Sequence, residues 1–144
     1  MTLCCIGFYG VSKTGKTTLI SRLVTQLTHE GYTIAVIKQT DKKIGMDTVG
    51  KDTWKHSQAG AQAIVLVSPV ETDIIIKRFL SISQIIEFLS CNKAFDLVFI
   101  EGASDPDIPK IRIGTCEMRT NTIANYHDNY EEIFQLIVKR IDQK

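Results

Sequence analysis

The sequence feature that most constrains this chain is a glycine-bounded run at residues 10–17, Gly-Val-Ser-Lys-Thr-Gly-Lys-Thr. It matches the pattern G-x-x-x-x-G-K-[ST] without gaps, which a chain of this length shows by chance about 0.5% of the time. The apolar stretch Leu3–Tyr9 precedes it, and apolar residues recur at helical spacing from Lys16 to about Glu30. A strand, a glycine loop and a helix in this order predict a phosphate-binding loop, because glycines let successive backbone N–H groups point at one anion.

The residues of this loop have distinct expected roles toward a nucleoside triphosphate. Lys16 should reach the β- and γ-phosphates, and the hydroxyl of Thr17 should coordinate Mg²⁺. Lys13 is either a second cation near the γ-phosphate or a solvated loop lysine. The predicted nucleotide-binding residues are Gly10, Val11, Ser12, Lys13, Thr14, Gly15, Lys16, Thr17 and Thr18.

The rest of the chain alternates between apolar strands and amphipathic helices. The expected strands are Thr33–Lys38, Gln62–Ser68, its antiparallel neighbour Asp73–Phe79, Phe95–Ile100 and Lys110–Ile113. The expected helices are Asp52–Ala59, capped by Asp52, then Ser81–Ser90, and a last one from Asp128 onward. This alternation predicts an α/β fold, the three-layer sandwich of P-loop NTPases, with a mostly parallel sheet and helices on both faces. No linker or repeat interrupts it, so we expect a single nucleotide-binding domain over residues 1–144.

Carboxylates that could serve the metal or the chemistry follow two of the predicted strands. Glu101 comes directly after Phe95–Ile100, at the carboxyl edge where ligands bind in open α/β sheets. We predict that Glu101 binds Mg²⁺ directly or through water; otherwise it is an edge residue without a role. Asp41 and Asp47 lie in the loop after Thr33–Lys38, and each either orients water or holds metal through water, or is a solvated loop acid. Asp96 begins its strand on the opposite edge and is expected to be structural.

Composition excludes several classes of protein. The 17 Lys and Arg residues against 16 Asp and Glu give a net charge of +1, which argues against a nucleic-acid partner. No apolar run approaches the roughly 18 residues that span a bilayer, so no membrane association is expected. The first residues lack the basic region of a signal peptide, and the four cysteines form no metal-binding spacing, which together favour the cytoplasm.

Several motifs, in this order, resemble the MobB family, the molybdopterin-guanine dinucleotide biosynthesis protein B proteins. They are the loop with its helix start (Gly10–Leu19), Gly50-Lys51-Asp52-Thr53 followed by Ala59-Gly60-Ala61, Ile100-Glu101-Gly102, and Ile108-Pro109-Lys110. The phosphate loop alone would indicate only the P-loop superfamily, whereas the later blocks are more specific. The resemblance covers roughly residues 3–113.

This resemblance implies a GTP-binding homodimer with weak Mg²⁺-dependent GTP hydrolysis. Such proteins assist the molybdopterin guanylyltransferase in molybdenum cofactor biosynthesis and help deliver the cofactor to molybdenum or tungsten apo-enzymes. By position, Asp47, Lys51 and Asp52 would lie beside the nucleotide and Glu101 near the metal. The catalytic residues expected on this basis are Lys16, Asp47 and Glu101.

The chain also departs from the family pattern. Members often have glycine where this chain has Lys13, and their usually histidine-rich loop reads Gln39-Thr40-Asp41-Lys42-Lys43 here. No NKxD motif is present, and the segment after Ile113, where base recognition is expected, is short. Thr122–Asn125 is a candidate for a strand with its loop, in which Asn125 would face the base.

An alternative reading is an ATP-dependent small-molecule ligase or kinase resembling dethiobiotin synthetase, in which a similar Glu-Gly-Ala segment follows a strand. A kinase ordinarily encloses the transferred phosphoryl group under an arginine-rich lid. The arginines of this chain do not cluster in a long loop; they are Arg22, Arg78, Arg112, Arg119 and Arg140. That distribution favours the accessory protein.

Overall fold

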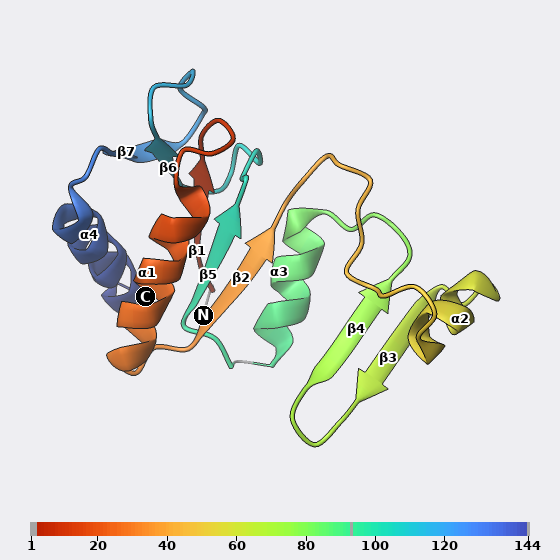
Figure 1. The fold of residues 1–144 in the computed structure, drawn as a ribbon. Coiled ribbons are helices and arrows are strands. Elements are labelled where there is room, and N and C mark those ends of the chain that lie inside the picture. The colour runs from red at the N-terminus through yellow and green to blue at the C-terminus, as the bar shows by residue number, and fades with distance from the viewer. Residues whose placement is uncertain (1–2, 93, 144) are drawn as a thin grey trace. The chain divides into compact units, whose positions relative to one another are not determined.

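The computed structural model describes residues 3–92 and 94–143, and the chain forms two compact units (Figure 1). The first unit contains the chain up to Thr40 and again from Ile82 onward, and the second contains Asp41–Ser81. The single domain expected over residues 1–144 stays a prediction.

The first unit is built on a five-stranded parallel sheet with the strand order β2-β5-β1-β6-β7. Its strands are β1 (Cys4–Tyr9), β2 (Ile34–Lys38), β5 (Leu97–Glu101), β6 (Lys110–Ile113) and β7 (Thr122–Tyr126). Residues 97–100 of β5 are fully buried, as expected for an apolar strand in the interior of a parallel sheet. Because the strands are parallel, the carboxyl ends of β1, β2, β5 and β6 meet at one edge.

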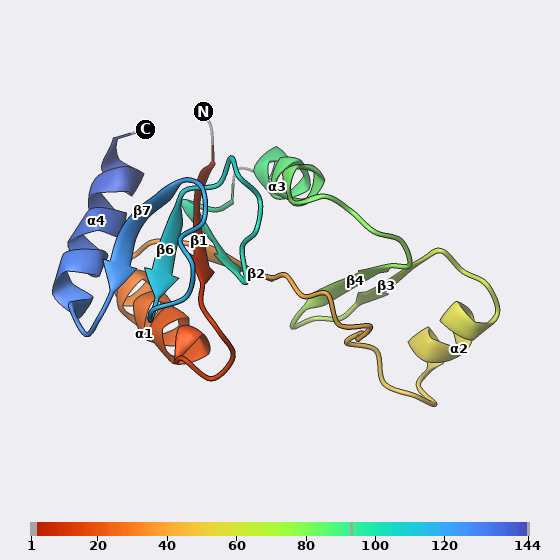
Figure 2. The same cartoon turned by 90° about the horizontal axis from the view of Figure 1, so that it is seen from above.

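Helices cover both faces of this sheet, which confirms the predicted fold class (Figure 2). The helices α1 (Lys16–His29) and α4 (Tyr130–Asp142) pack together on one face, where the core includes Phe8, Leu23 and Phe134. On the other face, α3 (Ile82–Cys91) packs through Ile82 onto the inner strand residues Val98 and Ile100.

The second unit contains α2 (Asp52–Gln58) and the strands β3 (Ala63–Val67) and β4 (Thr72–Ile76). The predicted antiparallel pairing of β3 and β4 is confirmed, but the pair forms a two-stranded sheet of its own. Many of its apolar side chains are exposed, among them Val65, Val67 and Ile74. The expected cap of α2 is wrong: Lys51 is the N-cap residue, and Asp52 lies in the first turn, where a carboxylate favours the positive end of the helix.

Two further differences from the predicted boundaries have local causes. The strand β5 starts at Leu97, because Asp96 precedes it and its Oδ2 accepts a hydrogen bond from the Thr33 backbone N–H at 2.7 Å. Asp96 is therefore structural, as expected. Asn125 lies within β7 rather than in a loop after it, and its Oδ1 accepts a hydrogen bond from Nε of Arg112 at 2.7 Å.

Candidate functional site

The loop between β1 and α1 has the tight backbone that its glycines predict. A Cβ atom on Gly10 would lie 2.5 Å from the Ile113 carbonyl oxygen, so only glycine allows β6 to approach this closely. Gly15, directly before α1, has a φ of 83°, and Lys13 has a φ of 62°, which is unusual for a residue other than glycine. Thr14 Oγ1 donates to the Val11 carbonyl at 2.8 Å and closes the loop.

The side chain of Lys16 lies across this loop. Its Nζ donates to the carbonyl oxygens of Gly10 at 2.8 Å and Val11 at 2.7 Å. The first turn of α1, Lys16, Thr17 and Thr18, contains no acidic residue of its own, and its N-terminus is the positive end of the helix. The loop therefore combines an ammonium group with a helix N-terminus, the two features that bind phosphate.

Glu101, at the end of β5, contacts the start of α1. Thr17 Oγ1 donates to Glu101 Oε1 at 3.0 Å, and Nζ of Lys38, at the end of β2, lies 3.6 Å from the same oxygen. The Glu101 side chain is 13% exposed, whereas that of Lys38 is 64% exposed. Water therefore reaches the Lys38 ammonium and weakens its attraction to Glu101. The structure thus brings together Thr17 and Glu101, the two residues predicted to hold Mg²⁺.

The backbone after Glu101 fixes the position of this carboxylate. The N–H groups of Gly102 and Ala103 both donate to the Phe8 carbonyl, at 2.9 and 3.2 Å, and Gln39 N–H donates to the Glu101 carbonyl at 2.9 Å. Gly102 has a φ of 82°, and a Cβ there would lie 2.5 Å from the Gln39 carbonyl oxygen. Gln39 was not predicted as a site residue, but its Oε1 is buried without a hydrogen-bond partner among the described residues.

Lys110 explains the Ile-Pro-Lys segment structurally. It is fully buried, and its Nζ donates to the carbonyls of Ile108 at 2.7 Å and Thr120 at 2.9 Å. Burial lowers the pKa of Lys110, because the charged form is desolvated. Lys110 therefore ties the entry of β6 to the segment before β7.

The segment between β6 and β7 is held on the same sheet face as α3. Phe8 faces α1 and α4, so its neighbour Tyr9 faces the opposite side, where its hydroxyl accepts a hydrogen bond from Arg119 N–H at 2.9 Å. The Arg119 guanidinium lies 4.8 Å from the centre of the Tyr9 ring, and its Nη1 donates to the Ala103 carbonyl at 2.6 Å. Arg119 thus links this segment to β1 and to the backbone after β5.

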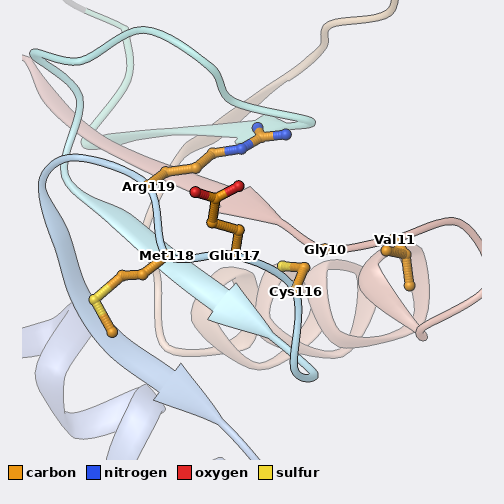
Figure 3. A pocket seen from close by; sticks show the side chains of 6 residues that line it. All are labelled: Gly10, Val11, Cys116, Glu117, Met118 and Arg119. Carbon is orange, nitrogen blue, oxygen red and sulfur yellow. The ribbon is translucent and has the colours of Figure 1, made fainter.

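This segment and the phosphate loop line a pocket of about 290 Å³ that is open to solvent (Figure 3). Its lining residues are Gly10, Val11, Cys116, Glu117, Met118 and Arg119. Base recognition was expected after Ile113, but none of residues 116–119 was predicted as a site residue. The available signal was a Cys-Glu-Met-Arg run separated by two residues from the end of β6, a strand that ends beside the phosphate loop.

The other predicted residues lie in the second unit. Asp47 Oδ1 accepts hydrogen bonds from Thr48 N–H and Thr53 Oγ1, both at 2.9 Å, and so stabilises the turn that leads into α2. Its Oδ2 is buried without a partner among the described residues. The nucleotide-facing roles predicted for Asp41, Asp47, Lys51 and Asp52 stay predictions.

Two absences hold for the described part of the chain. Within residues 3–92 and 94–143, no group of three or more His, Cys, Asp or Glu side chains is placed to hold a metal ion. In those same ranges, no helix is both long enough and apolar enough to cross a bilayer.

Comparison with known proteins gives a consistent result. The model of the family described as Molybdopterin guanine dinucleotide synthesis protein B (MobB) matches residues 5–138. A molybdopterin-guanine dinucleotide biosynthesis adapter protein of Haemophilus influenzae is 30% identical over 116 residues, which are 78% of this chain and 64% of that protein. Its counterpart in Escherichia coli is 28% identical over 109 residues, 74% of this chain and 62% of that protein. The chain thus spans less than two thirds of these curated relatives.

A solved structure shows the same fold. The crystal structure of Bacillus subtilis MobB aligns with a TM-score of 0.78 and covers 96% of this chain and 98% of that chain. The two sequences are 20% identical, so this likeness supports the fold and not the function.

Proposed function

We infer the function from one premise: this chain belongs to the molybdopterin guanine dinucleotide synthesis protein B (MobB) family. We propose that it is a GTP-binding adapter protein in the synthesis of the molybdenum cofactor, with weak Mg²⁺-dependent GTP hydrolysis. Its relatives are named as adapter proteins of molybdopterin-guanine dinucleotide biosynthesis, which favours this role over the ligase or kinase alternative.

The main observation that supports nucleotide binding is the position of the Lys16 side chain across the phosphate loop. The ammonium is held by two loop carbonyls at 2.8 and 2.7 Å, directly at the N-terminus of α1. A polyphosphate would offer oxygens of much higher charge than these carbonyls, so Lys16 would bind the β- and γ-phosphates in their place. The backbone N–H groups of the loop would bind the remaining phosphate oxygens.

The residues present fit a magnesium ion. Mg²⁺ prefers oxygen ligands, with one or two carboxylates. The Thr17 hydroxyl and the Glu101 carboxylate supply such oxygens 3.0 Å apart, and the buried Gln39 Oε1 lies on the residue that hydrogen-bonds to the Glu101 backbone. Thr17 and Glu101 would hold the ion directly or through water, where it would neutralise charge on the phosphates.

For hydrolysis, we propose Lys16, Glu101 and Asp47 as the acting residues. Lys16 and the metal held at Glu101 would stabilise the charge that develops on the leaving phosphate. For Asp47 we propose, from the family resemblance, that it orients the attacking water. Lys38, 3.6 Å from Glu101, keeps that carboxylate oriented toward Thr17.

The proposed partners follow from the family and from an exposed surface. We propose a homodimer that works in the cytoplasm with a molybdopterin guanylyltransferase and with molybdenum or tungsten apo-enzymes. In the second unit, several large apolar side chains are exposed, among them Val67 at 74% and Phe79 at 87%, and exposed apolar side chains that lie together mark interaction sites. A second copy of the chain would cover them.

Nucleotide titrations of two variants test the site. Lys16→Ala should weaken GTP binding about a hundredfold, because it removes two charge-assisted contacts. Glu101→Gln keeps an oxygen for Thr17 but loses the charge, so it should lose about tenfold in affinity with Mg²⁺ and nothing without it. Glu87→Gln, on the exposed surface of α3, is the matched control. Unchanged GTP affinity in Lys16→Ala would refute the proposal that this loop binds the nucleotide.

Sedimentation of the intact chain tests the homodimer. We expect one species of twice the chain mass at micromolar concentration, which dissociates when Val67 is replaced by arginine. A wild-type chain that sediments as a monomer at all concentrations would contradict the homodimer and leave the nucleotide site untouched.

A further inference from the structure

The pocket beside the phosphate loop has a fixed wall. Arg112 Nη1 donates to the Cys116 carbonyl at 3.1 Å, and Arg119 N–H donates to the Tyr9 hydroxyl at 2.9 Å, so both ends of residues 116–119 are held. The Arg119 side chain is occupied by the Ala103 carbonyl and the Tyr9 ring. A wall held in this way loses little entropy when a ligand binds against it.

Between these two anchors, the Glu117 carboxylate is free. Among the described residues it makes no hydrogen bond or ion pair, although Arg119 is two positions away and also lines the pocket. In Figure 3, the side chains of Glu117 and Arg119 rise on the same side of the segment. A free carboxylate repels further phosphate groups and accepts hydrogen bonds from neutral N–H donors. This pocket therefore suits an uncharged, donor-bearing ligand.

The pocket also offers apolar contacts to a flat ring. Val11, on the phosphate loop, is 61% exposed, and Met118, on the opposite wall, is 60% exposed. Figure 3 shows these two side chains at opposite ends of the group that lines the pocket. The volume of about 290 Å³ is just below the range of ligand pockets, roughly 300–1,000 Å³, and fits one ring system rather than a whole nucleotide.

We propose that this pocket binds a bicyclic heterocycle with a 2-amino-4-oxo edge, and that Glu117 is the residue that determines this specificity. Such an edge presents a ring N–H next to an exocyclic amino group, and one carboxylate accepts both hydrogen bonds side by side. Guanine and a pterin share this edge, so the ring is either the base of the bound GTP or a free pterin. The inference rests on the proposed function, since it concerns the ligands of that same site.

The replacement Glu117→Gln reverses the pattern that the edge must match. The glutamine oxygen still accepts from the ring N–H, but its amide NH₂ faces the exocyclic amino group, donor against donor. The same NH₂ is instead complementary to a 2-oxo group. Xanthine carries that group in place of the amino group of guanine, and lumazine carries it in place of that of pterin.

The experiment measures affinities of wild type, Glu117→Gln and the control Glu87→Gln by calorimetry. The probes are GTP, ITP, XTP and tripolyphosphate, and then pterin and lumazine with tripolyphosphate present. If the ring is guanine, wild type should prefer GTP over XTP by about tenfold to a hundredfold, and Glu117→Gln should remove or reverse that preference. If the ring is a free pterin, the same change should appear between pterin and lumazine and not among the triphosphates.

The remaining outcomes overturn the proposal. It fails if both preferences are the same in wild type and Glu117→Gln, or if Glu117→Gln weakens tripolyphosphate as much as GTP. Tripolyphosphate also separates this proposal from the nucleotide assignment. If wild type binds tripolyphosphate and Lys16→Ala does not, the phosphate site stands whatever Glu117 does.

Discussion

Replacing Gly102 by alanine tests how the backbone after β5 holds the carboxylate of Glu101. Gly102 has a φ of 82°, and its added Cβ would lie 2.5 Å from the Gln39 carbonyl oxygen. Gly114 is a matched control, because its φ is 79° but the nearest atom to an added Cβ is Thr14 Cγ2 at 3.7 Å. The two variants therefore share the backbone strain, and only one adds a steric overlap.

The magnitudes follow from these two contributions. A left-handed backbone costs an alanine about 1–2 kcal/mol, and the less flexible unfolded chain returns about 0.4–1 kcal/mol. Gly114→Ala should therefore lose about 1 kcal/mol of unfolding free energy. Gly102→Ala must also move a backbone carbonyl by several tenths of an ångström, which adds about 1–3 kcal/mol. We expect a total loss of about 2–4 kcal/mol.

Urea unfolding followed by circular dichroism measures both losses, and GTP titration with and without Mg²⁺ measures the effect on the site. Gly102→Ala should weaken the Mg²⁺-dependent part of GTP binding, because Glu101 directly precedes the displaced residue. Gly114→Ala should not. Equal losses of stability in the two variants would refute the reasoning, since the overlap with Gln39 would then cost nothing.

Two further predictions concern lysines. Lys13→Gly should gain about 0.5 kcal/mol in stability, because the relief of backbone strain at a φ of 62° outweighs the entropy cost of an added glycine. Lys13→Ala should gain nothing, because alanine keeps the strain. Equal melting temperatures of the two variants would contradict this prediction. Lys110→Met should lose about 2 kcal/mol in chemical denaturation, because the carbonyls of Ile108 and Thr120 lose their donor. Since burial lowers the pKa of Lys110, the unfolded chain binds more protons than the folded one as the pH approaches about 10.4. The stability contributed by Lys110 therefore rises with pH. The loss of unfolding free energy in Lys110→Met should accordingly increase from neutral pH toward pH 10. A loss that does not change with pH would argue against the pKa shift.

Much of the fold could be predicted because local patterns carry it. The strands β1, β2 and β5 are mostly apolar runs, and each flanking helix has apolar residues at helical spacing. The β3–β4 pair was predicted as two antiparallel strands, but not as a sheet of its own. These strands form a separate sheet with exposed side chains. An apolar run indicates that a strand can be buried, but it does not identify the surface against which the strand packs.

The site divides in the same way. The phosphate loop is contiguous in sequence, so its glycines and Lys16 could be assigned from spacing alone. Glu101 could be placed near Thr17 because parallel strands end at one edge, and the 3.0 Å contact between these side chains agrees with that placement. Gln39, Lys110 and Arg119 could not be assigned, because their roles depend on carbonyl groups brought close by the fold.

By itself, the sequence of this chain determined the phosphate loop, the parallel α/β sheet and the family, because these depend on local spacing and on the order of motifs. The tertiary structure decided what surrounds the loop. It placed residues 116–119 beside Gly10 and Val11, and it left the Glu117 carboxylate without a partner among the described residues while the Arg119 side chain contacts Ala103. It also buried Lys110, whose Nζ donates to the Thr120 carbonyl. The physical reason is that a pocket forms between chain segments that are distant in the sequence. Hydrogen bonds between those segments hold them in place, and local propensity does not predict these bonds.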